Sequence, residues 1–131
     1  KALLPGGDLA REMLPRELER RGIQTVEIDV YETVPAENRD PFLMEMLESG
    51  DIHVVTFTSS STVVNLLAAL RRLGASDPAA LLRGVQVACI GPITARTAEE
   101  NGLHVDIEAE TSTIDGLVEA LCARKQREKG E

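Results

Sequence analysis

Short apolar runs alternate along this chain with longer stretches that have helical spacing. The runs Ala2–Pro5, Ile52–Thr58, Gln86–Ile90 and Leu103–Ala109 are short and rich in apolar residues, and Ile23–Tyr31 alternates between polar and apolar residues. Runs of this length and composition are typical of β-strands, and strict alternation is typical of a strand with one buried face. The pattern predicts a strand in each of these segments.

Helical spacing occupies the stretches between the predicted strands. The predicted helices run from an N-cap at Asp8 to a C-terminal glycine at Gly22, over Pro41–Glu48, Ser60–Leu73, Asp77–Leu82 and Pro92–Asn101, and from a cap at Ser112 or Thr113 through Leu121. These ends follow the usual preferences for polar caps at the start of a helix and glycine after its last turn. Pro15 argues against an unbroken first helix. The charged tail from Arg124 to Glu131 is expected to fray.

Strands that alternate with helices of this length predict an α/β fold, with a parallel sheet and helices on both faces. The segment Glu32–Pro41 breaks this rhythm, since it has two prolines and no periodicity. We interpret it as a linker or crossover. The β-α-β unit before it, residues 2–31, is therefore expected to belong to a different sheet.

Composition and charge exclude several classes of function. The chain has 131 residues, enough for one ordinary domain or for pieces of two small ones. A net charge of −8 and the lack of Trp, with one Tyr and two Phe, argue against a nucleic-acid partner, which needs clustered cations or stacking aromatics. No apolar run is long enough to span a bilayer, and the start does not resemble a signal peptide. We expect no membrane partner and a cytoplasmic location.

The two cysteines, Cys89 and Cys122, lie in a predicted strand and a predicted helix without metal-ligand spacing around them. We interpret them as reduced thiols buried in a cytosolic fold and expect no metal site. His53 and His104 each stand near the start of a strand and are interpreted as surface residues. No catalytic pairing of serine or cysteine with histidine follows from the sequence, so a hydrolase is not supported.

The first candidate site is the loop that follows the strand Ile52–Thr58. It reads Thr58-Ser59-Ser60-Ser61-Thr62 and is called the first loop below. One of these hydroxyls is enough to cap the next helix. The others are free to bind an anion, because the N-terminus of a helix offers N–H donors and a positive dipole. Capping alone and a ligand site both remain open, and the loop lacks the lysine and glycine spacing of a nucleotide P-loop.

The second candidate site, called the second loop below, is Gly91–Thr94 after the strand Gln86–Ile90. Gly91 allows a ligand to approach the backbone, Pro92 suits the first helical turn, and Thr94 adds a hydroxyl. A simple tight turn into a helix explains the same residues. Tyr31, the single tyrosine, ends a strand just before the linker. It either covers the edge of a core or serves as a proton donor to a ligand.

With these residues in place, the chain resembles the C-terminal half of a uroporphyrinogen-III synthase. The matching segments come in family order: Leu4–Pro15 with Leu18 and Gly22, then Val30–Val34, Val55–Ser61, Ala88–Arg96 and Gly102–Val105. No single segment is diagnostic, but the ordered set spans nearly the whole chain. The resemblance implies a flavodoxin-like parallel sheet that is part of a two-domain synthase fold, with the active site between the domains.

The family's chain path implies a division of this sequence. Residues 1–31 would end the second α/β domain, residues 32–37 would form the interdomain linker, and residues 38–131 would supply the main part of the first α/β domain. The partner implied is the missing N-terminal half of the same polypeptide, so this chain alone is expected to be inactive. In some bacteria such a domain is fused to a uroporphyrinogen methyltransferase.

The implied reaction belongs to heme and other tetrapyrrole biosynthesis. It is the cyclisation of hydroxymethylbilane, a linear tetrapyrrole, to uroporphyrinogen III, with loss of water, inversion of the terminal ring and no cofactor. Carried over to this sequence, Tyr31 would help the hydroxyl leave. Substrate carboxylates would be held by residues of the first loop (Thr58, Ser59, Ser60, Ser61) and of the second (Gly91, Pro92, Thr94).

Two hypotheses of a different functional class, binding modules without catalysis, compete with the synthase hypothesis. One is a non-catalytic flavodoxin-like or receiver-like module, although a receiver needs an acidic cluster at the strand ends, where this chain has hydroxyls. The other is a periplasmic-type module that binds a sugar or small anion. Both predict ligand binding without cyclisation.

Overall fold

A computed structural model describes residues 1–7, 12–31 and 42–130. The chain divides into two compact units, Lys1–Glu37 and Asn38–Glu131, called unit 1 and unit 2 below. Asp8, the linker at 32–37 and Pro41 lie outside the described residues. Among the described residues, no helix is long and apolar enough to cross a membrane.

Unit 1 contains a β-α-β arrangement: β1 (Ala2–Gly7), α1 (Met13–Arg20) and β2 (Thr25–Tyr31). The two strands pair in parallel, from Ala2 opposite Thr25 to Gly7 opposite Tyr31. The expected stop at Pro5 was wrong, because β1 continues through it to Gly7. A proline is tolerated there because each strand of a two-stranded sheet has a free edge, where a missing N–H leaves no partner unpaired.

The described part of α1 begins at Met13, and Pro15 lies in its first turn, where the missing N–H breaks no helical hydrogen bond. Its C-terminus follows the prediction. Gly22 has φ +80°, its N–H bonds to the Glu19 carbonyl, and the Ile23 N–H bonds to the Leu18 carbonyl. This pair of hydrogen bonds is a Schellman motif, which requires a left-handed residue that glycine adopts without strain.

In the described residues of unit 1, the prediction that the Ile23–Tyr31 strand buries one face was wrong. Val26 and Ile28 of β2 are 40% and 45% exposed, and Leu3 of β1 and Leu14 of α1 are exposed as well. One helix and two strands are too few to cover both faces of a sheet. Unit 1 therefore presents apolar surface that the described residues leave uncovered.

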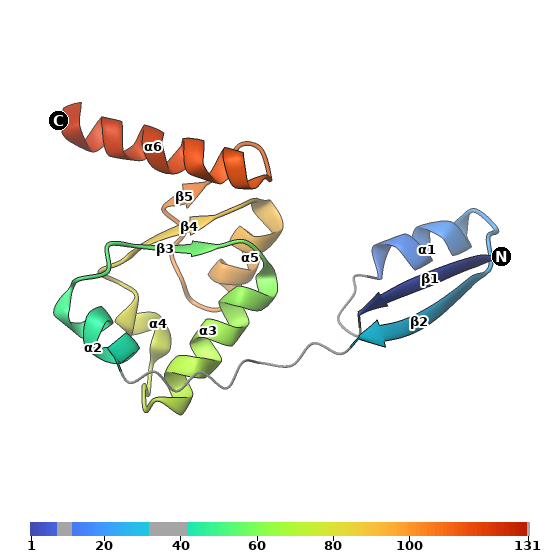
Figure 1. Cartoon of the computed structure of the whole chain (residues 1–131), viewed down its shortest axis with the longest axis horizontal. Helices are drawn as coiled ribbons and strands as arrows, with labels where there is room; N and C mark the ends of the chain where they lie inside the picture. The colour runs from blue at the N-terminus through green and yellow to red at the C-terminus, as the bar shows by residue number, and fades with distance from the viewer. Residues whose placement is uncertain (8–11, 32–41, 131) are drawn as a thin grey trace. The chain divides into compact units, whose positions relative to one another are not determined.

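Unit 2 contains the other elements (Figure 1): α2 (Phe42–Ser49), β3 (Val54–Phe57), α3 (Ser60–Arg72), α4 (Pro78–Leu81), β4 (Gln86–Cys89), α5 (Pro92–Glu100), β5 (Ile107–Glu108) and α6 (Ile114–Gly130). The strands form a parallel sheet in the order β3-β4-β5. This confirms the predicted alternation, with ends that differ from the prediction by a few residues.

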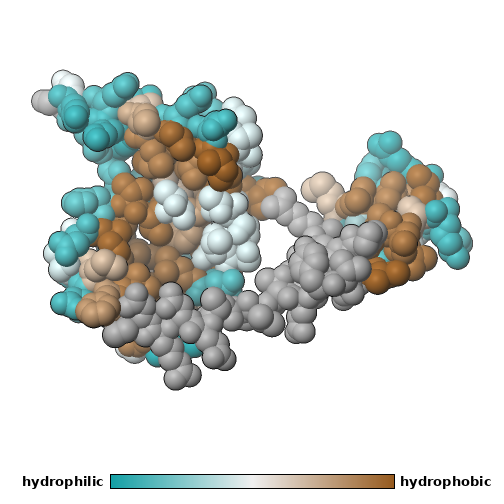
Figure 2. Space-filling model, in the orientation of Figure 1, coloured by the Kyte–Doolittle hydropathy of each residue, from teal (hydrophilic) through white to brown (hydrophobic). Residues whose placement is uncertain are grey.

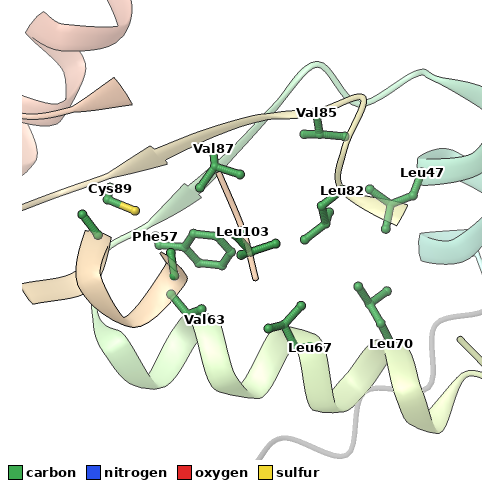
Figure 3. Close-up of a cluster of buried hydrophobic side chains, with 12 residues drawn as sticks. Leu47, Phe57, Val63, Leu67, Leu70, Leu82, Val85, Val87, Cys89 and Leu103 are labelled. Carbon is green, nitrogen blue, oxygen red and sulfur yellow. The ribbon is translucent and has the colours of Figure 1, made fainter. Parts of the chain in front are cut away.

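Helices cover both faces of this sheet, as predicted. On one face, Phe57 and Val87 pack with Val63, Leu67 and other residues of α3 and α5 (Figure 3). On the other face, Ala88 and Ile107 pack with Leu117 of α6. Side chains of successive strand residues point to opposite faces, so β4 contributes Val87 and Cys89 to one cluster and Ala88 to the other.

The strand predicted over Leu103–Ala109 is shorter in the structure, because the Asp106 side chain takes the place of a backbone hydrogen-bond acceptor. The Val87 N–H donates to the Asp106 carboxylate at 2.8 Å, while the Asp106 N–H donates to the Val87 carbonyl at 2.9 Å. The carboxylate thus accepts a hydrogen bond that a strand carbonyl would otherwise accept. Regular pairing begins only at Ile107.

The expected fraying of the C-terminal tail was wrong, because α6 continues to Gly130. Arg124 pairs with Glu128 at 3.2 Å, and the Gln86 side chain donates to the same Glu128 carboxylate at 2.8 Å. The hydrogen bond from Gln86 and then that from Arg124 lower the pKa of Glu128 from its ordinary value. The last turns of α6 are therefore tied to the start of β4.

Candidate functional site

The first and second loops lie side by side at one edge of the sheet. β3 and β4 are parallel neighbours with Phe57 opposite Cys89, and the Ile90 N–H donates to the Phe57 carbonyl at 3.0 Å. Both loops leave the carboxyl ends of these strands, which is where open α/β sheets bind ligands. The structure thus brings together the site residues predicted on unit 2.

Part of the first loop caps α3, the helix that follows it. Ser59 is the N-cap of α3, and its hydroxyl accepts from the Thr62 N–H at 3.3 Å. The Ser61 hydroxyl lies 3.0 Å from that of Ser59, and the Thr62 hydroxyl donates to the Ser59 carbonyl at 2.6 Å. The capping interpretation is therefore confirmed for Ser59.

Other donors of the first loop remain open to a ligand. Ser60 and Ser61 are the first residues of α3, and N–H groups at these positions have no partner within a helix. Thr58 is exposed, and no hydrogen bond among the described residues uses its hydroxyl. The Ser60 hydroxyl contacts Thr97 on α5. A ligand at this loop would meet mainly backbone N–H groups and the Thr58 hydroxyl.

The second loop leaves the N-terminus of α5 without a side-chain cap. Gly91 is the N-cap residue and makes no side-chain bond, and Pro92 follows at the first helical position and has no N–H. The N–H groups of Ile93 and Thr94 are then the orphan donors of this terminus. An uncapped helix start is suited to an anion, because the helix dipole adds to these donors.

Thr94 carries a further unused donor at the same place. It is only 4% exposed and is the buried polar residue of the described chain. No hydrogen bond to its hydroxyl is found among the described residues. No buried side-chain oxygen among the described residues lacks a partner, so the Thr94 hydroxyl itself reaches the surface and is accessible to a ligand.

Gly91 packs closely against a residue that the sequence did not indicate. Its backbone is extended, with φ −173° and ψ −177°, a conformation open to any residue. However, a Cβ on Gly91 would collide with the Ser112 hydroxyl and would lie 3.1 Å from the Ser112 Cβ. Ser112 precedes α6, so a third loop packs directly against the second.

Tyr31 is the last residue of β2, opposite Gly7 of β1. Its side chain lies outside the part of the chain that the structure describes. The predicted catalytic role of Tyr31 therefore stays a prediction. It belongs to unit 1, whereas both loops belong to unit 2.

The remaining reactive side chains do not form a second centre. The prediction of a buried thiol is confirmed for Cys89 and was wrong for Cys122, which is exposed on α6. Burial, followed by the charges of Glu108 and Glu99, raises the pKa of Cys89 to about 11. A thiol of that pKa is protonated at neutral pH and is a poor nucleophile. His104 is exposed, with its Nε2 3.7 Å from Asp106. Within the described ranges, no group of three or more potential metal ligands occurs.

Two residues near the loops were missed by sequence reasoning. Thr97 lies inside α5 with no local pattern to mark it, and Ser112 was weighed only as a cap for the last helix. Thr113 is that cap, since its hydroxyl accepts from the Gly116 N–H at 3.0 Å. The position of Ser112 after a third predicted strand could have pointed to it. In a parallel sheet the carboxyl ends of the strands lie at the same edge, so the segment after this strand lies near the first and second loops.

Comparison with known proteins decides the family. A sequence model of uroporphyrinogen-III synthase HemD matches residues 1–119, most of the chain. The chain belongs to the uroporphyrinogen-III synthase family. It is 37% identical over 125 residues to a relative from Methanothermobacter thermautotrophicus, with 92% of this chain and 48% of the relative covered. With the uroporphyrinogen-III synthase of Synechococcus elongatus it shares 34% identity over 112 residues, covering 85% of this chain and 42% of the relative.

Solved structures of the family have the same fold. The uroporphyrinogen III synthase of Thermus thermophilus superposes with a TM-score of 0.61 at 22% identity, covering 98% of this chain and 51% of the other. The enzyme from Helicobacter pylori superposes with a TM-score of 0.65 at 17% identity, covering 95% and 54%. The chain thus spans about half the length of the family members that it matches.

Proposed function

We propose that this chain is the C-terminal half of a uroporphyrinogen-III synthase. The intact protein would cyclise hydroxymethylbilane to uroporphyrinogen III in the cytoplasm, with loss of water and inversion of the terminal ring. Family membership supports the reaction. The observation that carries the site is the N-terminus of α5, which has no side-chain cap, beside the N-terminus of α3 at the carboxyl ends of two paired strands.

The chemistry of these two termini suits a substrate with several carboxylates. The first loop would bind one carboxylate through the N–H groups of Ser60 and Ser61 and the Thr58 hydroxyl, with Ser59 holding the helix start in place. The second loop would bind another through the Ile93 and Thr94 N–H groups and the Thr94 hydroxyl. Neutral donors at helix N-termini bind anions without a basic patch, which fits a chain of net charge −8.

Tyr31 is proposed as the general acid. The phenol would give its proton to the departing hydroxyl of hydroxymethylbilane, which leaves as water. The terminal ring would then attack the cationic carbon so formed, and a base would remove the proton of that ring in the last step. Besides proton transfer, the enzyme has to hold the chain so that the ring attacks with inversion rather than by simple closure.

The rest of the polypeptide is proposed to complete both units. In this assignment residues 1–31 end the second domain, residues 32–37 link the domains, and residues 38–131 form most of the first. Within unit 2, β3 is an edge strand of the described sheet and Val54 is 37% exposed. An open groove of about 530 Å³ runs beside it, lined by Val54, Ile107 and Leu121 among others. Parallel sheets are normally covered on both faces, so an additional strand and helix would fit here.

The product isomer tests the proposed reaction. Given preformed hydroxymethylbilane, the intact protein is expected to release the type III isomer, separated from type I by chromatography. This chain alone is the control and is expected to leave only the type I isomer, formed at the spontaneous rate. If the intact protein also releases type I alone, the proposed reaction is wrong and a non-catalytic small-anion binding module becomes the better description.

Replacing Tyr31 by phenylalanine tests the general acid. Removal of the phenolic proton is expected to lower kcat of the intact enzyme by about 10²-fold, the lower range for a lost acid–base group. The urea midpoint of unfolding should not change, since the ring is retained. An unchanged turnover would remove Tyr31 from the mechanism without affecting the proposed carboxylate sites.

A further inference from the structure

We propose that Thr97 is a positioning residue that sets the spacing between the N-termini of α3 and α5. The inference rests on the proposed function, because that spacing matters if both termini bind the same substrate. Thr97 lies on α5, beyond the second loop, and is half-buried. It does not touch the proposed ligand positions and would act through the helices that carry them.

The contact that supports this role joins two helices that are distant in sequence. The Thr97 hydroxyl oxygen lies 2.9 Å from that of Ser60, a residue 37 positions earlier and the first residue of α3. The same oxygen lies 3.2 Å from the Ile93 carbonyl oxygen, one turn back in α5. Thr97 therefore connects the start of α3 with the start of α5.

Thr97 is the donor in both of these contacts. A threonine hydroxyl has one proton, whereas a carbonyl can only accept. The Thr97 hydroxyl donates to the Ser60 oxygen at 2.9 Å, and the Ile93 carbonyl oxygen at 3.2 Å can only share that proton. The shorter bond, to Ser60, is the one that links the two helices.

The other contacts between these helices cannot fix their relative position in the same way. Val63 and Leu67 of α3 and Ala95 and Ala98 of α5 belong to one apolar cluster (Figure 3). Apolar burial is non-directional, whereas a hydrogen bond constrains a distance and an angle. Among the described residues, Thr97–Ser60 is the side-chain hydrogen bond that joins α3 to α5. This hydrogen bond is therefore the contact that opposes a shift of α3 relative to α5.

The spacing bears on binding because the two termini present separate sets of donors. Ser60 and Ser61 offer N–H groups on α3, and Ile93 and Thr94 offer them on α5. A substrate that bridges both sets gains from the second contact only if the two carboxylates meet their donors together. Thr97 would hold the two sets of donors at this spacing in the free enzyme, before the substrate binds.

Kinetics of the intact enzyme with hydroxymethylbilane test the role. Thr97→Val keeps the shape of the side chain and removes the hydroxyl. We expect KM to rise about fivefold, the size expected for one neutral hydrogen bond, with kcat within about twofold of the wild type. Thr97→Ser keeps the hydroxyl and is expected to restore KM to within about twofold. Thr25→Val is the matched control, since it removes a hydroxyl of unit 1 that, among the described residues, bonds only to Glu19.

The unfolding midpoint separates positioning from a merely structural contribution. A lower midpoint for Thr97→Val without a change in KM would overturn the proposal, as would an unchanged KM or a KM that Thr97→Ser fails to restore. A wild-type enzyme that forms only the type I isomer overturns the proposed function itself, and with it the positioning role, before any variant is compared.

Discussion

Replacing Gly116 by alanine is expected to destabilise unit 2 by about 3 kcal/mol, at the upper end of what overpacking a buried position costs. Gly116 is buried in the first turn of α6. A Cβ there would collide with the Thr111 carbonyl oxygen and would lie 3.0 Å from the Thr111 carbonyl carbon and 3.1 Å from the Thr113 hydroxyl. Two of these atoms are backbone, so no side-chain rotation relieves the contact.

The collision would also disturb the cap of α6. The Thr113 hydroxyl that the new Cβ would press against accepts the Gly116 N–H at 3.0 Å. Loss of such a cap costs about 1 kcal/mol by itself. Since α6 covers one face of the sheet through Leu117, displacement of its first turn would reach the core.

Cys89 provides a reporter that is specific to unit 2. Its thiol is fully buried and protonated, so alkylation at pH 8 proceeds only when unit 2 unfolds. Pulse alkylation of the intact protein across a urea series, followed by peptide mapping, should show a lower midpoint for Gly116→Ala. Gly84→Ala is the matched control, since nothing lies within 4 Å of its added Cβ. Equal midpoints for the two variants would contradict the packing of α6 described above.

Replacing Gly91 by alanine is expected to lower kcat/KM of the intact synthase by about tenfold, less than the ~10²-fold that a displacement of about 1 Å costs, because the Ser112 hydroxyl can rotate away and the Ser112 Cβ needs only a small shift. The extended backbone at Gly91 accepts alanine without strain. The cost instead comes from Ser112, whose hydroxyl and Cβ occupy the space. To make room, the start of α5 would shift, and with it the N–H groups of Ile93 and Thr94.

Ser112→Gly gives this prediction its control. The double variant Gly91→Ala/Ser112→Gly removes both atoms that the new Cβ meets, so most of the lost kcat/KM should return. Ser112→Gly alone measures the cost of losing the serine. If the double variant stays as slow as Gly91→Ala, the Cβ obstructs the substrate itself. Wild-type activity of Gly91→Ala would contradict a binding role for the second loop.

Family membership and geometry support different parts of the functional assignment. The order of the matching segments was sufficient to suggest the synthase family, and the family comparison confirms it. Val26 and Ile28 in unit 1 are exposed apolar residues, and β3 in unit 2 is an edge strand of the described sheet. Under the proposed function, these surfaces would contact the rest of the polypeptide. In Figure 2, brown apolar surface is visible on unit 1 and below α6.

The sequence alone was enough to predict the order of elements and the parallel sheet with helices on both faces. These features depend on interactions within one element or between its nearest neighbours: periodicity, the Ser59 cap, and the glycine after α1. Such interactions leave a pattern in a short window of residues, because the partners are at most a few positions apart.

Tertiary structure decided the features that depend on partners far apart in the chain. Asp106 shortens β5 by bonding to Val87, 19 residues away, and Gln86 extends α6 through Glu128, 42 residues away. Ser112 explains Gly91, and Thr97 holds Ser60. A hydroxyl or carboxylate has the same local appearance whether its partner is water or a distant strand. Only the folded chain assigns those partners, and they determine which donors of the two loops remain open to a ligand.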